Sequence, residues 1–110
     1  GKEQMLVQQF DSAAVSFSRC VEQKPDDYES WASLANIYLH KAQDLYASLG
    51  TRPTNEQKKA LQAYYTISCT YFENTKKYNE KDTSLWLEGL REVYFKLNKG
   101  KELKALEKYK

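Results

Sequence analysis

His40 is the only histidine in this 110-residue chain, and it is the residue best suited to acid–base chemistry or metal binding near neutral pH. Such a role needs partners at fixed geometry, and the nearest carboxylate along the chain, Asp44, is only an i+4 neighbour on the same predicted helix. We find no glycine-rich phosphate loop, Ser/His/Asp set, HExxH or paired-cysteine motif. We therefore interpret His40 as polar surface, and we expect a chain that is not an enzyme and uses no cofactor or metal.

The two cysteines, Cys20 and Cys69, have neither the spacing nor the histidine partner that would indicate a disulfide or a metal site. We interpret both as small apolar residues buried on helix faces. The nine tyrosines could offer a stacking surface to nucleic acid or sugar, but several recur at the spacing of helix core positions. The tyrosines expected in or beside the core are Tyr38, Tyr64, Tyr71 and Tyr94.

The charges of the chain are nearly balanced. A formal net charge of +2 gives no electrostatic case for nucleic-acid binding, which favours a strongly basic face. No apolar run approaches the ~20 residues that span a bilayer, so we expect no membrane span, and no signal peptide is visible. Glu102 and Glu107 are interleaved with the lysines of residues 96–110, which is typical of solvated surface. The partners that remain are a protein or peptide and, as a homo-oligomer, a second copy of the chain.

The helices expected in this chain follow an internal repeat. When the chain is laid on itself with an offset of 55 residues, Trp31 meets Trp86 and Phe17 meets Phe72. An aspartate before each tryptophan and two small residues around each phenylalanine also recur. Glycine and proline are sparse and lie at turns, which favours helices over a sandwich or barrel. The sequence therefore predicts an all-α chain of antiparallel helical hairpins.

The middle hairpin is expected to have two long arms. The helix that starts near residue 28 keeps its apolar spacing as far as Leu49 and stops at Gly50. After a turn, Thr54 or Asn55 can cap the next helix, with a glutamate or glutamine shortly after. We expect that second arm to run from Asn55 to Tyr78.

We interpret the chain as one domain, residues 1–110, made of three units. The first is cut short at its start, the second contains the long hairpin, and the third ends in a short helix that caps the array. Their bounds are residues 1–27, residues 28–82 and residues 83–110.

The two outer units are less regular than the middle one. In the first unit we expect a turn at residues 8 and 9, between the end of one helix and the start of another. In the third unit we expect an N-cap at Thr83 or Ser84 and one extra residue in the turn before Trp86. The capping helix is expected over residues 102–109.

Two sets of residues in this chain resemble the signatures of tetratricopeptide repeats, in which small residues admit close helix packing and large ones fill the gaps between layers. The end of the chain also looks like the closing repeats of certain bacterial members. The offset of 55 exceeds the family repeat of about 34 residues by roughly 21, which we assign to the long hairpin. The first-helix set is Trp31, Leu34, Ala35 and Tyr38, and the second-helix set is Ala13, Phe17, Cys20 and Pro25.

The resemblance implies a right-handed superhelix of about two and a half repeats, with a concave groove that binds peptides or protein segments. Some members hold a peptide carboxylate in a clamp of Lys, Asn and Arg, and Asn36 and Arg91 are suitable residue types for it. The full clamp is missing, because the first unit lacks most of one helix. The groove residues carried over by position are Ser33, Asn36, His40, Leu87, Glu88 and Arg91.

Two functions from different classes follow. The first is a non-catalytic scaffold or adaptor that binds a peptide or protein segment in the groove. The alternative is a structural segment of a larger repeat protein that self-associates through its long hairpin or its truncated first repeat. If the arms bind, the apolar residues expected to be exposed near the tip are Tyr46, Leu49 and Leu61.

Overall fold

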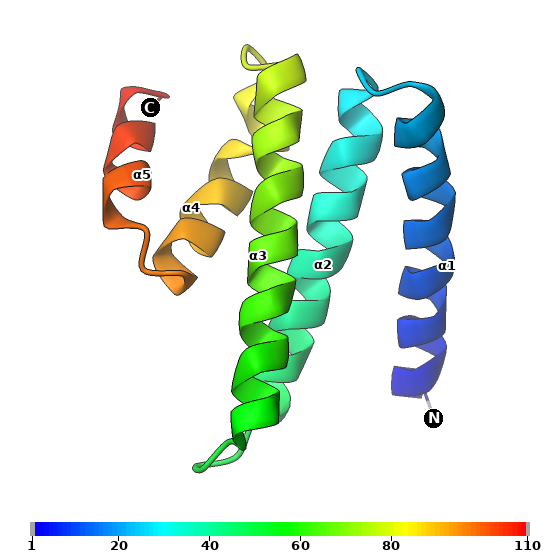
Figure 1. Cartoon of the computed structure of the whole chain (residues 1–110), viewed down its shortest axis with the longest axis vertical. Helices are drawn as coiled ribbons and strands as arrows, with labels where there is room; N and C mark the ends of the chain where they lie inside the picture. Colours follow the sequence, from blue (N-terminus) through cyan, green and yellow to red (C-terminus); the bar gives the residue numbers. More distant parts are fainter. Residues whose placement is uncertain (1, 110) are drawn as a thin grey trace.

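A computed structural model describes the backbone of residues 2–109 and the side chains of residues 12–109. Over that range the chain is all helical, with five α-helices, two short 3-10 helices and no strand. The molecule is a flattened row of helices, 39 × 32 × 19 Å, in which successive long helices run antiparallel (Figure 1). The α-helices are α1 (Lys2–Gln23), α2 (Tyr28–Ser48), α3 (Asn55–Tyr78), α4 (Leu87–Lys96) and α5 (Gly100–Ala105).

The long middle hairpin is confirmed, with 21 residues in α2 and 24 in α3. The predicted cap is present at Thr54, whose hydroxyl accepts a hydrogen bond from the backbone N–H of Gln57. The Gln57 side chain returns a bond to the backbone of Thr54, which completes a capping box. Along the arms, the buried Ser68 hydroxyl donates to the carbonyl of Ala35 at 2.7 Å, so small residues let α2 and α3 approach closely.

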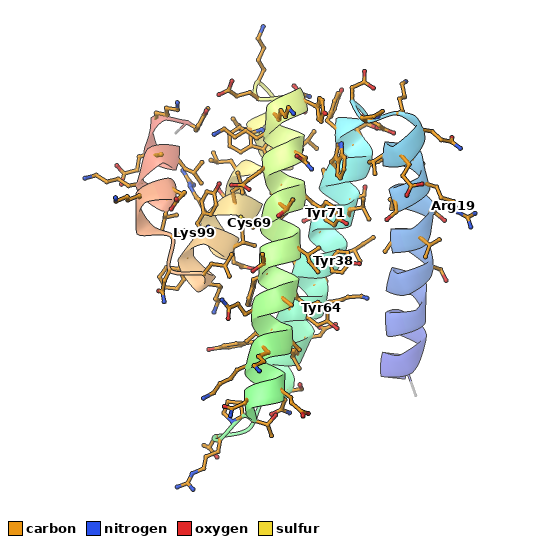
Figure 2. All side chains as sticks on the ribbon, viewed as in Figure 1. Arg19, Tyr38, Tyr64, Cys69, Tyr71 and Lys99 are labelled. Atoms are coloured by element: carbon orange, nitrogen blue, oxygen red, sulfur yellow. The ribbon has the colours of Figure 1, made fainter. Side chains whose placement is uncertain are left out.

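Two clusters of buried side chains hold the row together. The larger joins α2, α3, α4 and the carboxyl-terminal helices, and the smaller joins α1 to α2 through Ala14, Val21, Leu34 and Ile37. The four tyrosines expected in or beside the core are buried or half-buried, which confirms that prediction. Figure 2 shows the three labelled tyrosines on the side of the α2–α3 hairpin that faces α1, whereas Cys69 lies on the side of α4.

The helix α4 approaches α3 at Gly89. A Cβ atom placed on Gly89 would lie 2.2 Å from Cζ of Phe72, a residue that is 1% exposed. No side chain fits at that separation, so glycine allows the two helices to pack at this distance.

Each of the two tryptophans related by the 55-residue offset hydrogen-bonds to the turn that precedes its helix. The indole N–H of Trp31 donates to the carbonyl of Pro25 at 2.7 Å, six residues back. The indole N–H of Trp86 donates to the carbonyl of Asn79 at 3.1 Å, seven residues back. The difference of one residue agrees with the extra residue predicted in the second turn.

Several local predictions are wrong. The helix α1 is unbroken through residues 8 and 9, because no glycine or proline interrupts good helix formers there. No side-chain hydrogen bond from Thr83 or Ser84 caps α4. The chain instead passes through a 3-10 turn, Thr83–Leu85, before α4 begins with Trp86 at the N-cap position. The predicted capping helix is two pieces, α5 and a 3-10 turn at Leu106–Tyr109.

The two cysteines differ in burial. Cys69 is 4% exposed and belongs to the larger cluster, as expected. Cys20 is exposed, so the prediction that it is buried is wrong. The face of α1 that meets α2 is set by Ala14, Phe17 and Val21, and Cys20 lies beside that face.

Candidate interaction groove

An open hollow of about 600 Å³ lies between α2 and α4, and we call it the α2–α4 groove. It is lined by Asn36, Leu39, Glu88, Gly89, Arg91, Glu92, Phe95, Lys96 and Leu103. Three of the six groove residues expected from the sequence meet here, namely Asn36, Glu88 and Arg91.

The other three expected groove residues lie outside this lining. Ser33 is half-buried and His40 is exposed. Leu87 is 8% exposed and packs in the larger core cluster, so its side chain is part of the core. The side chains of α4 that line the groove are therefore those on the face opposite Leu87 and Leu90.

The apolar element of the groove is Phe95. Its side chain is 67% exposed, the largest value among the exposed large hydrophobic residues of the described part of the chain. Phe95 follows Glu88 and Arg91 by seven and four residues, so all three share one face of α4. The ring of Phe95 is open to solvent on an otherwise polar face, and aromatic residues are enriched at protein interfaces. Sequence reasoning missed Phe95, although an apolar residue in register with two groove candidates was a usable signal.

Several polar side chains of the groove already have partners within the chain. Arg91 Nη1 lies 3.1 Å from Glu88 Oε1, and the amide of Gln43 donates to Glu92 Oε2 at 2.7 Å. The amide of Asn36 donates to the carbonyl of Ala32 at 2.9 Å. A carboxylate that bound Arg91 would have to compete with Glu88 for the guanidinium.

A second hollow, of about 340 Å³, lies where the long arms extend past the end of α4. We call it the hairpin-end hollow. Lys96 lines both hollows, so they lie on either side of this residue. The residues that line the second one are Tyr46, Lys58, Leu61, Gln62, Tyr65, Lys96, Leu97 and Asn98.

The apolar residues near the hairpin tip are only partly exposed. Tyr46 is 55% exposed, whereas Leu49 and Leu61 are half-buried. The ammonium of Lys96 lies 4.3 Å from the centre of the Tyr46 ring, a cation–π contact that joins the end of α4 to the end of α2.

The titratable groups of the core are held in their protonated forms. Burial raises the pKa of the Cys69 thiol to about 12, and neighbouring Glu73 adds to the shift. Burial is also the first cause of the raised pKa of Tyr94, whose hydroxyl donates to Glu73 at 2.7 Å. Because a thiolate or phenolate is disfavoured at both positions, neither supplies a nucleophile at neutral pH.

Among residues 12–109, no group of three His, Cys, Asp or Glu side chains is arranged to hold a metal ion. None of the helices over the described range is long and apolar enough to cross a bilayer. Comparisons of the chain with protein-family models, with curated proteins and with solved structures found no match.

Proposed function

We propose that this chain is a non-catalytic interaction module that binds a peptide or a protein segment in the α2–α4 groove. The observation that carries the proposal is the 67% exposed ring of Phe95 on the wall of that groove. Binding sites draw much of their affinity from aromatic anchors surrounded by a polar rim. Phe95 supplies the anchor, and the paired side chains of Arg91 and Glu88 supply the rim.

The proposal includes a tetratricopeptide-like arrangement of about two and a half repeats. The antiparallel order of the helices supports it, as do the matching roles of Trp31 and Trp86, each of which donates to a carbonyl in the preceding turn. In this arrangement α2 and α4 are first helices of successive repeats, and the groove between them is the concave face of a right-handed superhelix.

The test compares two charge insertions at exposed apolar positions. Phe95→Glu places a carboxylate in the groove, and the matched control Val15→Glu places one on α1, where Val15 is 54% exposed. Both positions are helical and solvent-exposed, so neither variant is expected to change the far-UV circular dichroism spectrum or the midpoint of urea unfolding. Each protein is immobilised and used to capture partners from a lysate of the source organism, with mass spectrometry as the readout.

The proposal expects at least one protein that wild type and Val15→Glu retain and Phe95→Glu loses. That protein is then purified, and its dissociation constant is expected to rise at least about tenfold for Phe95→Glu, in line with the loss of an aromatic anchor. Equal retention by all three proteins would place the binding surface elsewhere and overturn the groove proposal.

A further inference from the structure

The hairpin-end hollow has an unbalanced charge. Two of its lining residues, Lys58 and Lys96, are basic, and none is acidic. The α2–α4 groove, by contrast, is lined by Glu88 and Glu92 as well as by Arg91 and Lys96. The lining of the hairpin-end hollow is therefore more basic than that of the α2–α4 groove.

The unbalanced charge lies over an apolar floor. Tyr65 is 3% exposed, and Leu61 and Leu97 are half-buried beside the larger core cluster. On α3, the lining residues Lys58, Leu61 and Tyr65 recur at intervals of three and four residues, so they form one helix face. Leu61 and Leu97 remain partly exposed because α4 stops at residue 96, short of the ends of both arms (Figure 1).

The two lysines are available to a ligand. Among the residues whose side chains the structure describes, no carboxylate forms an ion pair with Lys58 or Lys96. The contact that Lys96 makes is with the face of the Tyr46 ring, which leaves its ammonium without a counter-ion. Lys58 and Lys96 are both solvent-exposed, so a carboxylate can approach either ammonium from solvent.

We propose that the hairpin-end hollow binds an acidic segment of the partner, with an apolar side chain on the Leu61–Leu97 floor and an adjacent carboxylate held between Lys58 and Lys96. This inference rests on the proposed function, since Lys96 also lines the α2–α4 groove and one segment can run through both hollows. The partner is thus identified by its chemistry, as a peptide that carries Asp or Glu next to a large apolar residue.

The test uses a random-peptide phage library selected on the immobilised wild-type chain. Enriched peptides are synthesised, and their dissociation constants are measured for wild type, Lys58→Glu, Lys59→Glu and Phe95→Glu. Lys59→Glu is the matched control, because Lys59 is exposed on the same turn of α3 but does not line the hollow. Both lysine variants change the net charge equally, and a glutamate near the start of α3 suits the helix dipole.

The inference expects enriched peptides with an acidic residue next to a large apolar one. Binding should weaken at least about tenfold for Lys58→Glu, change little for Lys59→Glu, and weaken as the ionic strength approaches about 1 M, where the Debye length is about 3 Å. Backbone amide shifts in NMR spectra are expected to move at Tyr46, Leu61 and Lys96 when the peptide is added.

Other outcomes overturn the inference in distinguishable ways. Peptides that lose binding to Phe95→Glu but not to Lys58→Glu would keep the proposed function and reject the acidic segment. Equal losses for Lys58→Glu and Lys59→Glu would indicate a response to net charge alone and reject the hollow as the site. If no peptide depends on either Phe95 or Lys58, both the groove and the hollow are wrong. A wild-type dimer that Lys58→Glu dissociates would make a second copy of the chain the occupant.

Discussion

The packing of Trp86 gives the largest stability effect that we expect from a single substitution. The side chain is fully buried, and its indole N–H donates to the Asn79 carbonyl at 3.1 Å. The ring of Tyr109 meets it edge-on, with 4.9 Å between ring centroids, and the ammonium of Lys76 lies 5.6 Å from its centroid. Trp86→Ala would leave a cavity and an unpaired carbonyl, at a cost of about 3–5 kcal/mol.

That cost is a large part of the total stability, because the free energy of unfolding of a domain is about 5–15 kcal/mol. Two companion variants measure the contribution of the hydrogen bond and compare Trp86 with Trp31. Trp86→Phe keeps a ring but loses the hydrogen bond, for about 1–2 kcal/mol. Trp31→Ala removes the other tryptophan, which is only half-buried, so we expect about 1–3 kcal/mol.

Urea unfolding followed by far-UV circular dichroism measures these differences, provided that the slope of free energy against urea is the same for all variants. The expected order of destabilisation is Trp86→Ala above both Trp31→Ala and Trp86→Phe. A loss below about 1 kcal/mol for Trp86→Ala, or a larger loss for Trp31→Ala, would refute the reasoning, because either result would mean that Trp86 is not the packed centre of the larger cluster.

The remaining predictions concern Gly89 and the two cysteines. Gly89→Ala should lower the free energy of unfolding in urea by about 1–2 kcal/mol, because the added Cβ would lie 2.2 Å from the Phe72 ring and the cost of overpacking exceeds the gain in helix propensity. A variant more stable than wild type would contradict this packing. With a thiol-reactive dye, Cys20 should react in the folded protein and Cys69 only on unfolding, and equal rates would contradict the burial of Cys69. Burial raises the pKa of the Cys69 thiol from 9.0 to about 12, so its contribution to stability is fully present below about pH 9 and is lost as the pH rises towards about 12. Over that window, the free energy of unfolding should therefore fall less for Cys69→Ala than for wild type.

Much of the fold was predictable because its signals are local. The cap at Thr54 needs only a glutamine three residues later, and the spacing of Trp31 and Trp86 depends on two similar turns. The long hairpin followed from an apolar spacing that continued past the expected stop. Each of these signals depends on residues close together in the chain, so it can be identified from the sequence without knowing the tertiary packing.

The wrong predictions came from applying a repeat pattern where the local residues did not support it. The turn at residues 8 and 9 was expected from the position of the first unit, although nothing in that stretch breaks a helix. The exposure of Cys20 depends on which face of α1 meets α2, a tertiary fact that helical spacing alone does not determine.

The candidate site was predictable only in part. Asn36, Glu88 and Arg91 were identified by their position in the pattern, and they line one hollow. Phe95 could have been found from its register with Glu88 and Arg91, whereas the sharing of Lys96 by two hollows was not predictable, because it depends on where α4 ends relative to the arms of the hairpin.

The most direct test of the central claim is photo-crosslinking from the groove itself. A benzophenone amino acid is incorporated in place of Phe95 in one protein and in place of Val15 in another, and each is irradiated in a lysate of the source organism. The account predicts a crosslinked protein from position 95 that is absent from position 15, and whose crosslinked segment competes with wild-type binding when added as a free peptide. The same products from both positions, or no product from position 95, would contradict the claim that the α2–α4 groove is a binding site.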